Sequence, residues 1–370
     1  MRLTRQSGRY ALPADMNFPL DPAQSTRVDK KTALEPRLTR FLLALFITCT
    51  ASLVHAQQYT SVVIFGDSLS DTGNVAHLTQ QKYGVRIPGP IADYTDGRFS
   101  DGYDTLPAAQ NFVGVWIEQL AAMIPSHPEI KDSLDGGTNY AYGLATTGSG
   151  TTPFTFGPSD SLSVNVNNMG QQITDYLATS PKINKKTLFV LWGGAIDLLH
   201  ATSTASVVHA AINQALNVQR LIDHGATQFI VPNLPPLGLI PRLNGSLATS
   251  IPATQASILF NQVLAEGLAI VRLVNRNKNI QIAQLDVFSL FRQVTSSPSK
   301  YSLANVAGSS QGNFLVNPDT YLFWDDLHPT TRGHGILADA ADRLLDAQTC
   351  RSTLGIVRNA QCWNADILVH

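Results

Sequence analysis

The chain has 370 residues, of which 44% are apolar, and this is ample for a large hydrophobic core. Its 26 basic and 27 acidic side chains leave a formal net charge of −1, so nucleic acid and anionic membranes are not expected as partners. The low charged fraction of 14% fits secretion better than a crowded cytosol, and we expect a monomer.

The N-terminal region predicts a targeting segment. Residues 1–36 are a polar extension without clear periodicity, whereas residues 37–56 are typical of a signal peptide. They combine arginines, an apolar run and the small-residue cleavage site Val54-His55-Ala56. The run is too short to cross a bilayer stably, so no stable membrane span is expected. A buried helix over residues 41–54 is the alternative interpretation.

Cleavage between Ala56 and Gln57 predicts a secreted or periplasmic protein with a single domain over residues 57–370. Processing leaves the cysteines Cys350 and Cys362. A cysteine pair in an exported chain suggests a disulfide, worth about 2–3 kcal/mol for so short a loop. Two unpaired thiols are the alternative.

Apolar runs then alternate with segments of helical apolar spacing. Strands are predicted at 61–65, 187–192, 228–231 and 280–285, with a short strand or extended lead at 321–324. Helices are predicted at 112–123, 169–179, 205–224, 252–276 and 330–345. Residues 75–111 and 146–168 are rich in loop-forming residues and are expected to line a substrate groove. The alternation predicts an α/β fold with a parallel sheet covered on both faces.

The first strand stops at Gly66-Asp67-Ser68, which places Ser68 in the turn beyond a parallel strand. Open α/β sheets place their chemistry at this end of a strand, where backbone N–H groups are free to face a substrate. Ser68 is therefore a candidate nucleophile, provided that a base lies elsewhere in the chain. The alternative is a helix-capping serine. Asp67 and Asp71 are interpreted as residues that orient this turn.

A candidate base lies near the other end of the chain, where Asp325 precedes His328 by three residues. On one loop, the Asp325 carboxylate can hold the imidazole in a single tautomer while His328 takes the proton of Ser68. Asp326 is the alternative partner of the histidine.

Several stretches resemble the signature blocks of the GDSL, or SGNH, esterase and lipase family, and the resemblance spans residues 59–345. They are Phe65–Asn74, Gly97–Gly102, Gly137–Gly143, Val231–Gly238 and Asp325–Pro329, in the order of the family. The resemblance implies a flavodoxin-like, mostly parallel sheet in a three-layer α/β/α sandwich. It also implies a secreted serine esterase or acylhydrolase that cleaves carboxylic esters through Ser68, His328, Asp325 and an acyl-enzyme.

One block departs from the family pattern. The resemblance implies that backbone N–H groups of Ser68 and Gly143 bind the oxyanion and that an asparagine side chain completes the hole. Ile196 occupies the usual asparagine position and donates nothing. Loss of one oxyanion donor typically costs about 10²–10³ in rate. We therefore expect either a weaker enzyme or another donor, for which Asn139 and Asn233 are considered.

Two other functions stay open beside the esterase. One is a non-catalytic lipid- or glycan-binding relative on the same fold, and the other is an acyltransferase of the cell envelope. The polar and aromatic loops favour short acyl chains or glycan acetate as substrate. No cofactor and no metal are expected, because no cluster has the required spacing. Asp197 is left between a loop-holding role and a place near the site, and four histidines are interpreted as surface or helix-face residues: His200, His209, His224 and His334.

Overall fold

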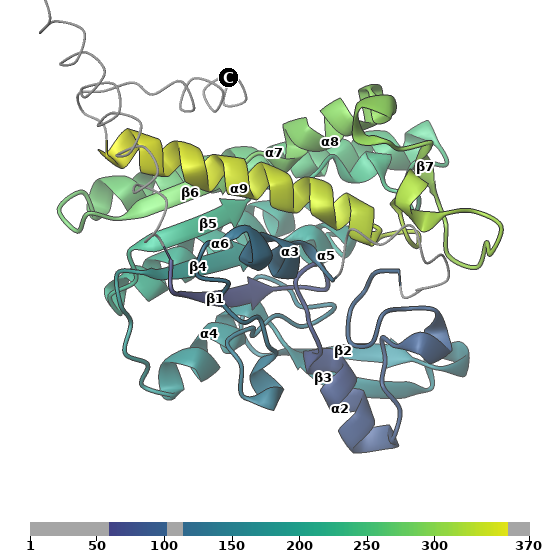
Figure 1. Ribbon diagram of the computed structural model, residues 1–370, viewed down its shortest axis with the longest axis horizontal. Coiled ribbons are helices and arrows are strands. Elements are labelled where there is room, and N and C mark those ends of the chain that lie inside the picture. The colour runs from purple at the N-terminus through teal and green to yellow at the C-terminus, as the bar shows by residue number, and fades with distance from the viewer. Residues whose placement is uncertain (1–58, 102–113, 354–370) are drawn as a thin grey trace, which may run out of the picture. The chain divides into compact units, whose positions relative to one another are not determined.

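The computed structural model describes residues 59–101 and 114–353, and its side chains up to residue 348 (Figure 1). The described residues all belong to one compact unit. The expected N-terminal extension, the signal peptide with its cleavage site, and the side chains of Cys350 and Cys362 lie outside this part of the chain.

A parallel sheet of four strands in the order β1-β4-β5-β6 forms the centre. The strands are β1 (Ser61–Gly66), β4 (Thr187–Trp192), β5 (Gln228–Pro232) and β6 (Gln281–Leu285). Every residue of β4 is buried, as both faces of this central strand are covered by helices. All four correspond to strands predicted from apolar runs.

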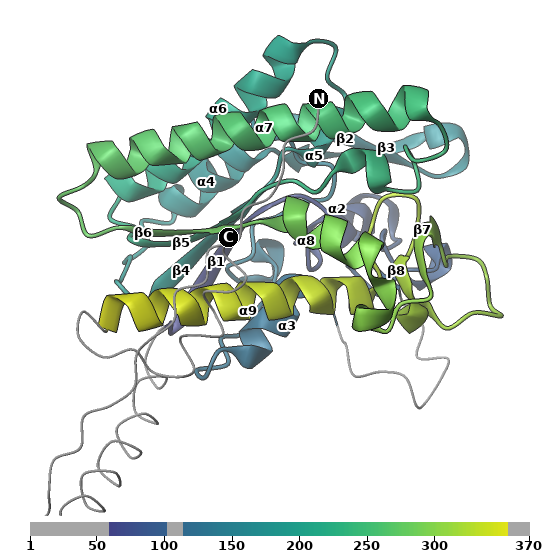
Figure 2. The same ribbon diagram turned by 90° about the horizontal axis from the view of Figure 1, so that it is seen from above.

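Helices cover both faces of this sheet, as Figure 2 shows. Helices α3 (Trp116–Met123) and α9 (Thr331–Thr353) lie on one face. Helices α4 (Met169–Ala178), α6 (Thr204–Asp223) and α7 (Leu247–Val274) lie on the other. The shorter α5 (Ala195–Leu199) and α8 (Val287–Ser296) follow β4 and β6 directly. The predicted three-layer α/β/α sandwich is thereby confirmed.

Helix α7 is, by length and composition, the described helix that is apolar enough to cross a membrane. It lies along α6 (Figure 2) and buries Phe260, Leu264 and Leu268 in the core. Part of the apolar composition of α7 is therefore explained by its packing against the central sheet.

The edge of the sheet beside β1 carries an additional extended segment that the sequence did not reveal as a strand. Ile64 N–H donates to Thr138 O at 3.1 Å, and the N–H of Tyr140 donates back to Ile64 O at 2.8 Å. Tyr142 N–H continues the ladder to Gly66 O at 3.2 Å. The pairing brings the following residue, Gly143, alongside the end of β1.

Two segments predicted as loops contain regular structure. Helix α2 (Asn74–Tyr83) lies within the predicted 75–111 loop and ends at Gly84, whose φ of 73° suits glycine. Strands β2 (Thr151–Phe156) and β3 (Leu162–Asn167) form an antiparallel hairpin within the predicted 146–168 loop. Side chains of β2 alternate in exposure, so their polar residues hid a half-buried strand.

The predicted fifth strand is not part of the central sheet. Strand β8 (Tyr321–Phe323) pairs in parallel with β7 (Asn305–Ser309) in a separate two-stranded sheet. Short 3₁₀ helices complete the described elements at Pro90–Ala92, Ser133–Asp135, Pro158–Asp160, Leu237–Leu239, Pro298–Tyr301 and Pro318–Thr320.

Candidate active site

The turn after β1 holds Ser68 at the carboxyl edge of the sheet. The N–H groups of Ser70 and Asp71 both donate to Asp67 O at 3.1 Å, which closes the turn. Gly66 is required at its start, because a Cβ there would lie 2.5 Å from Trp192 O on the neighbouring strand. The Ser68 N–H has no hydrogen-bond partner among the described residues, so it remains available to a substrate.

Three predicted residues meet at this edge through hydrogen bonds. Ser68 Oγ lies 2.9 Å from His328 Nε2, and His328 Nδ1 lies 2.6 Å from Asp325 Oδ2. All three residues are buried. The loop forms locally because Asp325 Oδ1 accepts the N–H groups of Leu327 and His328 at 2.7 and 2.6 Å. The arrangement has the geometry of a nucleophile, a base and an orienting carboxylate.

The choice between the two neighbouring aspartates follows from their partners. Burial alone would raise the pKa of Asp325, but the charge of His328 and its hydrogen bonds hold that pKa well below its usual range. Asp326 instead forms an exposed ion pair with Arg242, at 2.8 Å between Oδ1 and Nη2. The carboxylate beside the imidazole is thus Asp325.

Two further aspartates support the turn. Asp71 Oδ1 accepts the N–H groups of Gly73 and Asn74, both at 2.8 Å, at the start of α2. Burial raises the pKa of Asp71 to about 6 although these amides oppose the shift. Asp67 Oδ1 accepts the N–H of Leu69 at 3.1 Å, and burial raises the pKa of Asp67 to about 7. Their orienting role agrees with the interpretation of the sequence.

Gly143 differs from its expected role. Its N–H donates to Asp71 Oδ2 at 2.9 Å, so that hydrogen is not free to bind an oxyanion. The next residue, Leu144, has a φ of 67°, in the left-handed region that non-glycine residues rarely adopt. The Leu144 N–H has no hydrogen-bond partner in the described part of the chain. The sequence missed this residue because a leucine signals no special backbone conformation.

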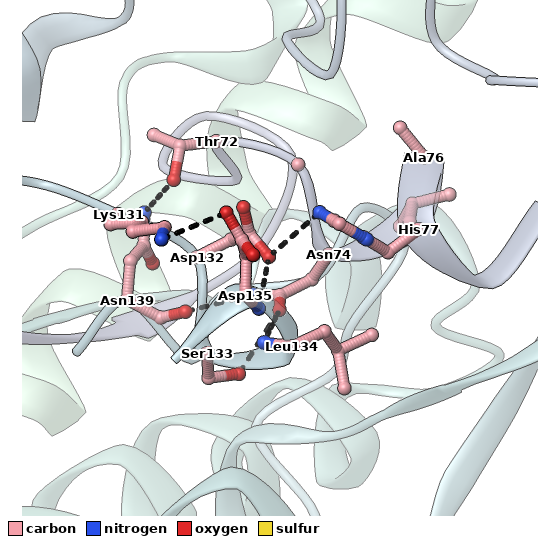
Figure 3. Close-up of polar contacts among 12 residues, drawn as sticks. Thr72, Asn74, Ala76, His77, Lys131, Asp132, Ser133, Leu134, Asp135 and Asn139 are labelled. Atoms are coloured by element: carbon pink, nitrogen blue, oxygen red, sulfur yellow. Dashed lines mark hydrogen bonds and ion pairs between the residues drawn. The ribbon is translucent and has the colours of Figure 1, made fainter. Parts of the chain in front are cut away.

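Neither asparagine considered as a substitute donor is free. Asn139 Nδ2 donates to Ser70 O at 2.7 Å and to Thr72 Oγ1 at 2.9 Å. Figure 3 shows this amide beside Thr72. Asn233 Nδ2 donates to Asp286 Oδ1 at 2.9 Å. Both amides hold loops together. The structure therefore shows neither asparagine in the place of the donor that Ile196 lacks.

Ile196 lies on α5 with only 3% of its surface exposed, and it lines the pocket beside Ser68 and His328. The side chain of the adjacent Asp197 is hydrogen-bonded to Thr147. Its two carboxylate oxygens accept hydrogen bonds from the N–H and from the hydroxyl of Thr147, each at 2.9 Å. Asp197 therefore holds the loop after Gly143 rather than the Gly193–Ala195 loop.

The pocket at the triad is almost entirely apolar. Its polar lining residues are Asp67, Ser68 and His328, and the remaining residues come from strands, helices and connecting segments around the end of β1. They are Leu69, Trp192, Ala195, Ile196, Pro235, Leu237, Ile240, Phe291, Phe323, Leu327 and Pro329. Such a lining suits an aliphatic group of a bound ligand.

One group of possible metal ligands exists in the described part of the chain: His77, Asp132 and Asp135, whose ligand atoms lie within 4.8 Å of one another (Figure 3). Asp135 forms an ion pair with Lys131 at 2.9 Å, and Asp132 Oδ1 accepts Asp135 N–H at 3.1 Å. His77 Nε2 also lies 3.4 Å from Asp132 Oδ1, so the three side chains of the group contact one another or neighbouring residues.

His334 is not the helix-face or surface histidine that the sequence suggested. It is fully buried in α9, and neither ring nitrogen has a hydrogen-bond partner in the described structure. Burial lowers the pKa of His334 to about 3, so the ring is neutral. The other three histidines assigned to the surface, His200, His209 and His224, are exposed.

Two contacts at the triad were not predicted from the sequence. The ring centroids of Phe99 and His328 lie 5.1 Å apart, with an interplanar angle of 31°. The hydroxyl of Tyr94 donates to Asp325 Oδ2 at 2.7 Å. Both come from the segment between Gly84 and Asp101, which the sequence placed near the site without singling out these side chains.

Comparison with known proteins gives matches over most of the chain. An uncharacterized protein in the trpE-trpG intergenic region of Pseudomonas putida is 28% identical over 84% of this chain and 52% of its own length. The thermolabile hemolysin of Vibrio parahaemolyticus is 26% identical over 76% of this chain and 63% of its own length. The phosphatidylcholine-sterol acyltransferase of Aeromonas hydrophila is 24% identical over 78% and 91% of the two chains.

The chain thus spans about half to two thirds of the length of the first two relatives. Residues 62–341, about three quarters of the sequence, match the family described as GDSL-like Lipase/Acylhydrolase. The match includes the turn of Ser68 and the loop of Asp325 and His328, and the chain belongs to this family.

Proposed function

We propose that this protein is an exported serine hydrolase of carboxylic esters. The observation that carries the proposal is the hydrogen-bonded series Ser68–His328–Asp325, of which Ser68 and His328 line an apolar pocket. Membership of the GDSL-like Lipase/Acylhydrolase family supports the same chemistry. The lowered pKa of Asp325 beside the buried histidine is a further observation that favours an enzyme over a non-catalytic binding protein.

In this mechanism Ser68 Oγ attacks the acyl carbonyl carbon while its proton passes to His328 Nε2. Asp325 orients the imidazole and stabilises the imidazolium that forms. The tetrahedral intermediate collapses when His328 gives the proton to the departing alcohol, which leaves an acyl group on Ser68. Water then attacks this ester, His328 takes the water's proton and returns it to Ser68, and the acid is released.

The oxyanion is bound by backbone N–H groups in this proposal. Ser68 N–H is one donor, and Leu144 N–H replaces the Gly143 N–H that Asp71 occupies. Ile196 supplies no side-chain donor. Because one lost donor typically costs about 10²–10³ in rate, the enzyme works below the rate that a full hole allows.

The pocket beside Ser68 is apolar and has a volume of only about 30 Å³, which supports the short acyl group expected from the loops. Acyl transfer to an alcohol is a second candidate, and its specific support is the Aeromonas hydrophila relative named as a phosphatidylcholine-sterol acyltransferase. Water and an alcohol compete for the same acyl-enzyme, so both outcomes share the first half of the mechanism.

Hydrolysis of p-nitrophenyl acetate, butyrate and octanoate by the purified protein tests the proposal. Ser68→Ala should abolish turnover on all three esters. Ser70→Ala is the matched control two residues away, because its hydroxyl only accepts the Trp116 Nε1 hydrogen, at 3.0 Å, and should change turnover by less than about fivefold. Serine-independent hydrolysis, or none, would refute the esterase. A fall in p-nitrophenol release that is matched by ester formation on added alcohol would favour transfer.

Export is part of the same proposal and has its own measurement. The N-terminal sequence of the protein recovered outside the cytoplasm should begin at Gln57. A protein that stays in the cytoplasm with residues 37–56 intact would contradict export.

A further inference from the structure

The carboxylate of Asp325 has a hydrogen-bond donor from a distant part of the sequence. Tyr94 Oη donates to Asp325 Oδ2 at 2.7 Å, and this is the oxygen that lies 2.6 Å from His328 Nδ1. The other oxygen accepts the N–H groups of Leu327 and His328. Among the described residues, Tyr94 is the one donor to this carboxylate from outside residues 325–328.

The segment that carries Tyr94 is fastened to the chain on the far side of the histidine. Ser100 Oγ donates to Pro329 O at 3.1 Å. Asp101 accepts both the N–H and, at 2.9 Å, the hydroxyl of Thr331. Because these bonds connect the same two segments as the Tyr94 contact, the hydroxyl is held against Asp325 by several fixed points.

The protonation state of the tyrosine suits a permanent donor. Burial, and then the negative charge of Asp325, raise the pKa of the Tyr94 hydroxyl above its usual value. The hydroxyl therefore keeps its proton wherever Asp325 is ionised. Its O–H dipole directs a partial positive charge at the carboxylate, which reduces the negative potential that Asp325 exerts on the imidazole.

We propose that Tyr94 is a positioning residue of the triad, which fixes the Asp325 carboxylate and moderates the strength with which that carboxylate stabilises protonated His328. The inference rests on the proposed serine mechanism. Tyr94 contacts Asp325 through its hydroxyl and acts on Ser68 only through Asp325 and His328.

Other groups around these two residues are unchanged by removal of the hydroxyl. Among them, the groups that the charge of His328 affects are Asp67, in the turn after β1, and His334 in α9. Near Tyr94, Asp326 is paired with Arg242 across an exposed contact, and the Gln311 side-chain amide donates to Ala92 O at 3.2 Å. A change on removal of the hydroxyl is therefore assigned to the Tyr94–Asp325 contact.

The test compares Tyr94→Phe with the wild-type protein by two measurements. The midpoint of the His328 ring titration, followed by NMR, should rise by about 0.5 pH unit, because the carboxylate regains negative charge. The acidic limb of the kcat/KM profile should move in the same direction. A misplaced carboxylate should lower kcat about tenfold, as expected when a hydrogen bond to a charged group is lost, with KM changed less than about threefold.

Tyr83→Phe is the matched control. It also removes a bonded tyrosine hydroxyl, which donates to Ser163 O at 2.9 Å in the β2–β3 hairpin, but this hydroxyl makes no contact with the triad. An unchanged His328 titration in Tyr94→Phe overturns the proposal even if kcat falls, because the tyrosine would then be only structural. A shifted titration supports it. If that shift occurs in a protein without Ser68-dependent turnover, the positioning role stands and the proposed function fails.

Discussion

Replacement of Ile196 by asparagine is the most direct perturbation of the oxyanion hole. Ile196 lines the same pocket as Ser68 and His328 and is almost completely buried, so under the proposed mechanism an amide at this position adds a donor to the pocket that the reacting ester enters. A complete side-chain donor is worth about 3–4 kcal/mol of transition-state stabilisation. The backbone N–H groups already share the charge, so we expect part of that gain, about 10- to 100-fold in kcat.

The same substitution should destabilise the folded protein. Loss of a buried isoleucine side chain removes about 1.5–3 kcal/mol of hydrophobic stabilisation. An asparagine amide without partners among Trp192, Ala195 and Leu237 adds about 1–3 kcal/mol when no substrate is bound. The sum, about 2.5–6 kcal/mol, means that the variant gains catalytic power at the expense of stability.

The assay is kcat on p-nitrophenyl acetate for the folded variant, with the free energy of unfolding measured in urea. Ile196→Val and Ile196→Leu are the controls, because they change the shape of the pocket and add no donor. They should alter kcat by less than about threefold. If Ile196→Asn is folded and raises kcat less than about twofold, the reasoning about a missing donor at this position is wrong.

Three further predictions concern the surroundings of the triad. Gly143→Ala should lower both stability and kcat, because its Cβ would overlap the Phe99 ring that packs against the His328 ring. Gly148→Ala should change both little, because its Cβ would lie 3.6 Å from the nearest atom, Thr146 Oγ1. Unfolding in urea and ester kinetics measure the two effects. Between about pH 4 and pH 7 the raised pKa of Asp67 makes the native state bind more protons than the unfolded state, so stability falls as the pH rises. Asp67→Asn should remove this contribution and reduce the slope by at most about 1.4 kcal/mol per pH unit. Urea titrations at several pH values measure the slope, and an unchanged slope would contradict a protonated Asp67. Asn74→Ala should cost about 3 kcal/mol or more, because its amide loses two buried and two partly buried hydrogen bonds. A loss below about 1 kcal/mol in the same assay would mean that water replaces them.

The central sheet was predictable because a strand buried on both faces leaves a continuous apolar run. Thr187–Trp192 is buried at every position, and the sequence identified it at its full extent. Helices with a wide buried face, such as α4 and α6, were also predictable, because their apolar residues recur at helical spacing. The hairpin of β2 and β3 was missed because alternating exposed threonines resemble a polar loop.

Some residues of the candidate site were also predictable from the sequence, and others were not. A short local spacing allowed the sequence to pair Asp325 with His328, since three residues of one loop connect them. Motif order and resemblance then joined them to Ser68 across 260 residues. The roles of Gly143, Asn139 and Asn233 could not be read in this way, because each depends on which distant group takes its hydrogen: Asp71, the Ser70–Thr72 turn and Asp286.

What the sequence determined by itself was the class of fold, the turn that carries Ser68, the Asp-His loop and the absence of an amide at residue 196. Each of these depends on a local pattern of side chains, which the chain carries whether folded or not. Only the tertiary structure decided that Tyr94 contacts Asp325, that Asp71 accepts the Gly143 N–H, and that the buried His334 ring has no hydrogen-bond partner among the described residues. These are contacts between segments far apart in the chain, and their distances are set by the packing of helices against the sheet.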